Sequence, residues 1–228
     1  MAIQLPLGIG LHDEASFENF VSTGNEQLVA TLCDEACLDK IIYLWGGASV
    51  GKSHLLHAWC KKSSETGRGV AFIPLTQYQE LSPDMCDGLE SLDAVCIDDI
   101  DAIAGLSDWQ EAIFHLYNRM RDAGKLILIS GNAAPTGLGL TLADLVSRLN
   151  GALVVHVSGL DDEAKITALK LRASARGLEL SNEVAQFMIR RYPRDLSVLL
   201  TLLDKLDHAS LAAQRRLTIP FIKQVIQQ

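Results

Sequence analysis

The feature that most constrains this chain is the stretch from Gly46 to Ser53, which reads Gly-Gly-Ala-Ser-Val-Gly-Lys-Ser. It matches G-x-x-x-x-G-K-[ST], the pattern of a phosphate-binding loop. Glycine permits left-handed backbone angles and lets the backbone approach a phosphate closely. The backbone N–H groups of the loop, and the N-terminus of the helix that follows it, both favour the binding of an anion. In such a loop Lys52 reaches the β- and γ-phosphates, and the Ser53 hydroxyl binds Mg²⁺. The predicted nucleotide-binding residues here are Gly46, Gly47, Ala48, Ser49, Val50, Gly51, Lys52, Ser53 and His54.

The same stretch also contains G-x-S-x-G, the pattern of the nucleophile elbow of α/β-hydrolases. That alternative would make Ser49 a nucleophile, and it needs an acid and a histidine later in the chain. Asp98 with His156 or His208 would have to fill those roles. The elbow does not require the lysine and serine that end the stretch, whereas the phosphate-binding loop explains both.

Strands and helices are predicted to alternate as far as residue 157. Apolar runs predict strands at residues 41–45, 69–75, 92–99, 126–130 and 152–157. Apolar residues at helical spacing predict helices at residues 25–37, 53–62, 107–123 and 140–149. Ser107 and Gln110 have the spacing of a capping box at the start of the third of these helices. Such an alternation predicts a five-stranded parallel sheet with crossover helices and a ligand at the carboxyl ends of the strands.

The character of the chain changes after residue 157. Only helices are predicted beyond this point, at residues 161–176, 181–192, 194–213 and 218–228. The expected organisation is therefore a flexible tail at residues 1–15, an α/β domain at 16–157 and a small all-helical domain at 158–228.

Polar side chains stand where two predicted strands end. Asp98 and Asp99 close one apolar run, which is the form of a Walker B element, and Asp98 would bind Mg²⁺ directly or through water. The alternative is that one aspartate of the pair caps the turn that follows. Asn132 stands just after the next strand, so we expect it at the same edge of the sheet.

Charge and composition narrow the classes of protein. The chain has 28 Asp and Glu against 20 Lys and Arg, a net charge of −8. This argues against broad nucleic-acid binding, though not against a local basic patch. No apolar run approaches the roughly 18 residues of a membrane-spanning helix, and the first residues lack the basic region of a signal peptide. Five cysteines without a C-x-x-C pair are expected to be reduced thiols in a cytoplasmic protein.

Together these motifs resemble the AAA+ nucleotide-binding module, and most closely that of the bacterial replication initiator DnaA. The resemblance runs from about residue 15 to residue 228. Its segments are Phe17-Glu18-Asn19-Phe20-Val21, Gly51-Lys52-Ser53-His54-Leu55-Leu56-His57-Ala58, Ile97-Asp98-Asp99-Ile100, Leu145-Val146-Ser147-Arg148-Leu149 and Pro193-Arg194-Asp195-Leu196. It implies an AAA+ sheet domain followed by a helical lid, with ADP or ATP and Mg²⁺ as ligands.

The resemblance also implies roles for single residues. Asn132 takes the place of the first sensor, and Arg194 that of the second sensor, which contacts phosphate from the lid. Arg148 matches the arginine finger, which acts on a neighbour's nucleotide. Phe20 and Val21 are the candidates for contact with the base. The candidate catalytic residues are therefore Arg148, Asp98, Asp99 and Asn132.

With two departures from DnaA, the chain resembles the DnaA-related regulators of the Hda group. The sequence ends at Gln228, with the lid, where DnaA continues into a DNA-binding domain. Near the start, Gln4-Leu5-Pro6-Leu7 resembles the peptide by which many proteins dock on the bacterial sliding clamp, through Gln4, Leu5 and Leu7. Regulators of this group, bound to the clamp, make ATP-bound DnaA hydrolyse its ATP. The implied partners are DnaA and the clamp (the DNA polymerase III beta subunit), without sequence-specific DNA binding or a membrane; a homo-oligomer stays open.

Two other functions are open to such a sequence: an ATPase motor that loads a helicase or clamp, and a DNA-binding initiator. The acidic charge argues against the initiator. Asp99 argues against the motor, because hydrolysing AAA+ proteins usually carry glutamate there. Aspartate is one methylene shorter, and a misplacement of about 1 Å can cost about a hundredfold in rate. We therefore expect slow or absent intrinsic ATP hydrolysis.

Overall fold

The computed structural model describes residues 15–34, 40–213 and 215–226. Its contacts divide the chain into two compact units. The sheet unit takes most of the chain up to Val157, and the helical unit takes residues 158–228. Residues 21–26 and 48–50 group with the helical unit.

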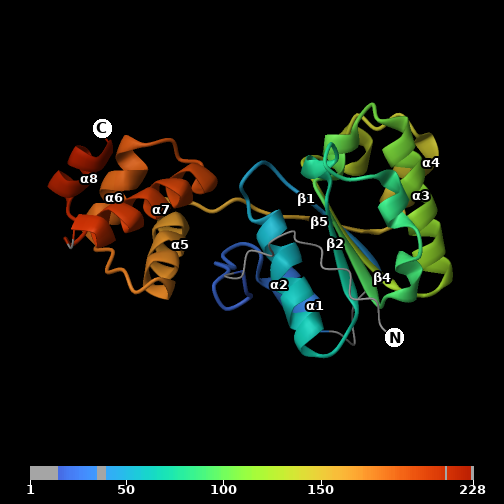
Figure 1. Ribbon diagram of the computed structural model, residues 1–228, viewed down its shortest axis with the longest axis horizontal. Helices are drawn as coiled ribbons and strands as arrows, with labels where there is room; N and C mark the ends of the chain where they lie inside the picture. The colour runs from blue at the N-terminus through green and yellow to red at the C-terminus, as the bar shows by residue number, and fades with distance from the viewer. Residues whose placement is uncertain (1–14, 35–39, 214, 227–228) are drawn as a thin grey trace. The chain divides into compact units, whose positions relative to one another are not determined.

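Five strands of the sheet unit pair in parallel in the order β2-β3-β4-β1-β5 (Figure 1). They are β1 (Ile41–Trp45), β2 (Val70–Pro74), β3 (Ala94–Asp98), β4 (Leu126–Gly131) and β5 (Leu153–His156). The predicted five-stranded parallel sheet is confirmed. Its central strands are unbroken apolar runs because both of their faces are buried, which removes any need for a polar alternation.

Helices cover both faces of this sheet. Figure 1 shows α1 (Glu26–Cys33) and α2 (Lys52–Glu65) on one side, and α3 (Ser107–Asp122) and α4 (Ala143–Asn150) on the other. On the first side, His57 of α2 stacks on Phe72 of β2 with the ring centroids 4.1 Å apart. On the second side, Ile113 and Leu116 of α3 are buried in one apolar core with Ile97 of β3. Alternate residues of each strand therefore supply two separate cores.

Short 3₁₀ helices fill several connections of the sheet unit, at Leu75–Gln77, Pro83–Cys86, Leu89–Ser91, Ile100–Ile103 and Pro135–Gly137. The predicted capping box at the start of α3 is wrong, because Leu106 stands at the N-cap and its apolar side chain makes no capping hydrogen bond. Gln110 is instead fully buried: its Nε2 donates to the Ile103 carbonyl at 3.0 Å, and its Oε1 accepts from the N–H groups of Thr141 and Leu142, both at 2.9 Å. Gln110 thus ties the start of α4 to α3.

The helical unit contains α5 (Asp162–Ala175), α6 (Asn182–Arg191), α7 (Leu196–Ala213) and α8 (Ile219–Ile226). The side chains of Asp161 and Ser181 cap α5 and α6 by accepting from backbone N–H groups. The unit has its own apolar core, built largely from Leu169, Met188, Leu199, Leu203, Leu206 and Phe221. Within the described ranges, no helix has the length and apolar character needed to cross a membrane.

Candidate functional site

The loop from Gly46 to Ser53 leads from β1 into α2 at the carboxyl ends of the strands. The Gly46 N–H donates to the Gly131 carbonyl at 3.3 Å, which holds the start of the loop against β4. Ser49 and Gly51 have left-handed φ angles of 59° and 102°. A Cβ atom at Gly51 would lie 2.8 Å from the Phe20 ring, so both the φ angle and the space require glycine there.

Lys52 is the first residue of α2, and its side chain is buried. Its ammonium donates to the carbonyls of Gly46 and Gly47, both at 3.0 Å, and to Oδ1 of Asn132 at 2.9 Å. These bonds use all three donors of the ammonium. Two residues predicted from separate motifs, Lys52 and Asn132, are therefore brought together at the loop.

Asn132 is held in turn by Asp101. The backbone N–H of Asn132 donates to Oδ1 of Asp101 at 2.9 Å, and its Nδ2 donates to Oδ2 at 2.6 Å. The amide oxygen of Asn132 is thereby turned towards Lys52. Asp101 was missed by the motifs, although it is the third acidic residue in the short run that begins at Asp98.

Ser130 orients the two acidic residues at the end of β3. Asp98 is buried, and its Oδ1 accepts from the fully buried hydroxyl of Ser130 at 2.5 Å. The same hydroxyl accepts from the backbone N–H of Asp99 at 2.8 Å. The motifs missed Ser130 too; the available signal was a hydroxyl at the end of an otherwise apolar buried strand.

Asp99 has the left-handed angles φ 55° and ψ 59°. Few residues other than glycine adopt such angles, and they mark a strained position. Asp99 precedes the 3₁₀ helix at Ile100–Ile103, but its side chain makes no capping bond, so its carboxylate stays available to the site. Burial and the nearby charge of Asp98 raise the pKa of Asp99 to about 6; Lys52 lowers it and Asp101 adds to the rise.

The predicted Mg²⁺ donors are the Ser53 hydroxyl and the Asp98 carboxylate. Magnesium usually keeps several waters and is bound by one or two carboxylates together with substrate phosphates. Across the described residues, no group of three or more His, Cys, Asp or Glu side chains could hold a metal ion. The Ser53 hydroxyl and the Asp98 carboxylate would hold a metal ion that arrives with a nucleotide, and such an ion would neutralise phosphate charge.

Phe20 and His54 meet beside the loop. Their ring centroids are 5.5 Å apart, and the Nε2 atom of His54 lies 2.9 Å from the carbonyl oxygen of Ser16. His54 therefore anchors the segment that carries Phe20. Val21 belongs with the helical unit. The roles of these three residues in nucleotide binding stay predictions.

The two predicted arginines have different surroundings. Arg148 lies in the last turn of α4 and is half-buried, and its carbonyl accepts from the Tyr117 hydroxyl at 2.9 Å. In the part of the chain that the structure describes, the guanidinium of Arg148 has no hydrogen-bond or ion-pair partner. Arg194 of the helical unit is largely exposed and pairs with Asp162 at 3.5 Å.

The candidate clamp-binding residues Gln4, Leu5 and Leu7 lie outside the described residues. The hydrolase alternative also finds no support in the site: Asp98 is bound by Ser130, and His156 packs its ring against Trp45 of β1 with the centroids 4.4 Å apart.

A strand order of 2-3-4-1-5, with the phosphate-binding loop after β1 and a polar residue after β4, is the arrangement of the AAA+ class of proteins. Residues 11–156 match the family model of the bacterial DnaA ATPase domain, and residues 162–226 match that of the Hda lid domain. The first match spans more than half of the chain. The chain therefore belongs to the DnaA family, as an Hda-like, DnaA-related AAA+ protein.

Solved structures agree with this fold. Domain III of the replication initiation protein DnaA from Thermotoga maritima superposes with a TM-score of 0.80 at 22% identity, over 94% of this chain and 96% of that one. AMPPCP-bound DnaA from Aquifex aeolicus gives 0.66 at 23% identity, over 84% and 65%. RuvB from Thermotoga maritima gives 0.70 at 16% identity, over 96% and 73%.

Proposed function

We propose that this protein is a nucleotide-bound AAA+ regulator of replication initiation. Together with the sliding clamp it stimulates ATP hydrolysis by DnaA and so inhibits re-initiation. The observation that carries the proposal concerns Arg148 at the end of α4. Its guanidinium has no hydrogen-bond or ion-pair partner among the described residues. A guanidinium is always charged and offers a fork of donors suited to a γ-phosphate, so Arg148 supplies a finger to the nucleotide of DnaA.

The regulator itself holds ADP or ATP with Mg²⁺. Support comes from the buried Lys52, from Asn132 beside it and from the AMPPCP that the Aquifex relative binds. Lys52 binds the phosphates, Ser53 and Asp98 hold the metal, and Asn132 and Asp101 keep the lysine in place. The metal, when bound, neutralises phosphate charge.

The sliding clamp is the second partner, bound through Gln4, Leu5 and Leu7. An extended peptide would insert the two leucines into an apolar groove while Gln4 makes polar contacts. Burying two leucines gives about 3–6 kcal/mol before ordering costs are subtracted, which fits micromolar affinity. The protein acts in the cytoplasm, where the replication machinery is found.

The test is an ATP-hydrolysis assay that contains ATP-bound DnaA, clamp loaded on DNA, and the purified protein. Wild-type protein should accelerate hydrolysis by DnaA. Protein that lacks residues 1–8 should stay folded yet lose both clamp binding and most of the stimulation. Undiminished stimulation by the truncated protein would show that the clamp is bound elsewhere or is not needed.

The second candidate is a slow AAA+ ATPase that loads a helicase or clamp. The presence of Lys52, Asp98, Asp99 and Asn132 favours it, because an ATPase needs a lysine for the phosphates and polar side chains beside it, and Lys52 is bonded to Asn132. The short side chain of Asp99 disfavours it. Steady-state hydrolysis by the purified protein separates the two, since rapid turnover without DnaA would favour the motor.

A further inference from the structure

The charges of this chain are divided unevenly between its parts. Residues 158–228 carry eleven Lys and Arg against eight Asp and Glu, a net charge of +3. Residues 1–157 carry nine against twenty, a net charge of −11. The helical unit is therefore the basic part of an acidic protein.

Several acidic side chains of the helical unit are already engaged. Asp161 caps α5, and Asp195 accepts from the N–H groups of Ser197 and Val198 at the start of α7. Asp204 pairs with Arg176, and Asp162 with Arg194. These carboxylates are occupied with the unit's own helix starts and cations.

Five exposed cations stand at the end of α6, before α8 and on α8; we call them the basic surface. They are Arg190, Arg191, Arg215, Arg216 and Lys223. Over the described residues, none of the five has an ion pair with a carboxylate. Their charges are therefore not neutralised within the unit.

Contacts between side chains connect the elements that carry these cations. Lys223 of α8 lies 5.7 Å from the centre of the Phe187 ring on α6. Arg190 and Arg191 follow Phe187 by three and four residues, so they lie one turn along the same side of α6.

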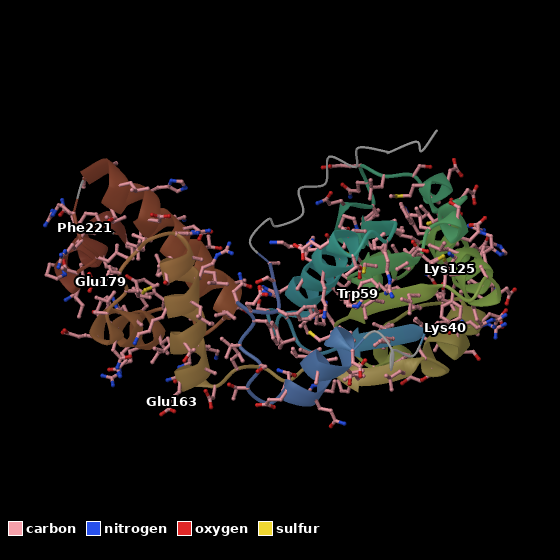
Figure 2. All side chains as sticks on the ribbon, turned by 90° about the horizontal axis from the view of Figure 1, so that it is seen from below. Lys40, Trp59, Lys125, Glu163, Glu179 and Phe221 are labelled. Atoms are coloured by element: carbon pink, nitrogen blue, oxygen red, sulfur yellow. The ribbon has the colours of Figure 1, made fainter. Side chains whose placement is uncertain are left out.

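The loop before α8 continues this surface. The guanidinium of Arg215 lies 5.2 Å from the centre of the Phe221 ring, and it donates at 3.3 Å to the side chain of Gln224, which follows Lys223 in the sequence of α8. Figure 2 labels Phe221 at one end of the helical unit and the acidic Glu163 at a different end.

We propose that the basic surface binds the phosphate backbone of duplex DNA without sequence preference. Arginine forks match phosphate oxygens, and several unpaired cations within reach of one another suit a regular polyanion. The acidic remainder of the chain repels DNA and confines the contact to this surface.

A protein partner would be expected to add apolar contacts. The Phe187 and Phe221 rings lie under Lys223 and Arg215, which favours phosphates over an acidic protein.

The test is fluorescence anisotropy with a labelled duplex at several salt concentrations. Wild-type protein should bind with a dissociation constant of about 10⁻⁴–10⁻⁶ M. The logarithm of the association constant should fall with the logarithm of the salt concentration, with a slope of about −3 to −4. The double variant Arg190→Ala/Arg191→Ala should bind about 10- to 100-fold more weakly at about 0.1 M salt and lose about 2 units of slope.

The matched control is Lys61→Ala/Arg121→Ala, which removes two exposed cations from the sheet unit and should leave binding unchanged. An equal loss in this control would overturn the assignment to the basic surface, as would wild-type protein that fails to bind at about 50 mM salt. Unlabelled duplex should displace the labelled duplex better than a polyglutamate peptide does at an equal concentration of negative charge. Equal displacement by the peptide would show instead that the surface binds an acidic protein.

Discussion

The ammonium of Lys52 lies 2.9 Å from the side-chain oxygen of Asn132, a residue eighty positions further along the chain. Asp101 fixes the orientation of that amide through two further hydrogen bonds. The lysine is therefore held between the loop and the residue that follows β4.

Lys52→Ala should remove nucleotide binding. A ligand that binds only the folded protein adds about 2.7 kcal/mol of stability at 100 times its dissociation constant. Wild-type protein should therefore melt at a higher temperature when ADP and Mg²⁺ are added, whereas the variant should show no such shift. An unchanged wild-type melting temperature would contradict nucleotide binding at this loop.

Gly51→Ala should destabilise the sheet unit even without nucleotide. The residue has a left-handed φ, and the added methyl group would meet the Phe20 ring, so we expect a loss of about 2–4 kcal/mol in the free energy of unfolding. Adding Phe20→Ala should recover the steric part of that loss.

Gly47→Ala is the matched control for Gly51→Ala, because no atom of the described residues lies within 4 Å of a Cβ atom built at Gly47. The free energy of unfolding of Gly47→Ala, measured by chemical denaturation, should stay within about 0.5 kcal/mol of the wild-type value. Equal losses at the two glycines would show that Phe20 does not lie against the loop as described.

The sequence predicted the strands well because buried parallel strands are local apolar runs, and β1, β3 and β4 lie within one or two residues of their predicted bounds. It also predicted the loop, whose residues are adjacent in the chain. Ser130 and Asp101 were missed because their roles depend on partners about 30 residues away. Gln110 was misread for the same reason, since its partners Thr141 and Leu142 lie in a later connection.

Asp195 should stabilise the helical unit in a pH-dependent way. The hydrogen bond from the Ser197 hydroxyl is the main cause that lowers the pKa of Asp195 below its ordinary value of 3.8. Hydrogen bonds from the Ser49 side chain and from two backbone N–H groups lower it further. Because the folded pKa is depressed, the stabilisation is present above about pH 4 and is lost as pH falls through the folded pKa.

Asp195→Ala should therefore cost about 0.5–2 kcal/mol at pH 7, as the loss of a helix cap does, and less near pH 3. Urea unfolding of wild type and variant at both pH values measures this. A loss that is as large at pH 3 as at pH 7 would contradict a role for the charged carboxylate.

Tyr117→Phe should weaken the action of Arg148 without removing it. The Tyr117 hydroxyl holds the Arg148 carbonyl, and losing one such bond costs about 0.5–1.5 kcal/mol. We expect stimulation of DnaA to fall roughly 2- to 10-fold while nucleotide binding is unchanged. Tyr78→Phe is the control, since among the described residues the Tyr78 hydroxyl accepts only from the side chain of Gln79. An equal fall in that variant would contradict a specific role for the bond between Tyr117 and Arg148.

The most direct test of the central claim, that this protein supplies Arg148 to the ATP of DnaA, is the rate of ATP hydrolysis by DnaA with clamp-loaded DNA. An arginine finger is worth about 10³–10⁵ in rate, so Arg148→Ala should abolish stimulation while keeping fold, nucleotide and clamp binding. Arg148→Lys should fail almost as badly, because a point charge does not reproduce the fork. Arg121→Ala, another arginine of the sheet unit, should stimulate normally. Wild-type stimulation by Arg148→Ala would contradict the claim.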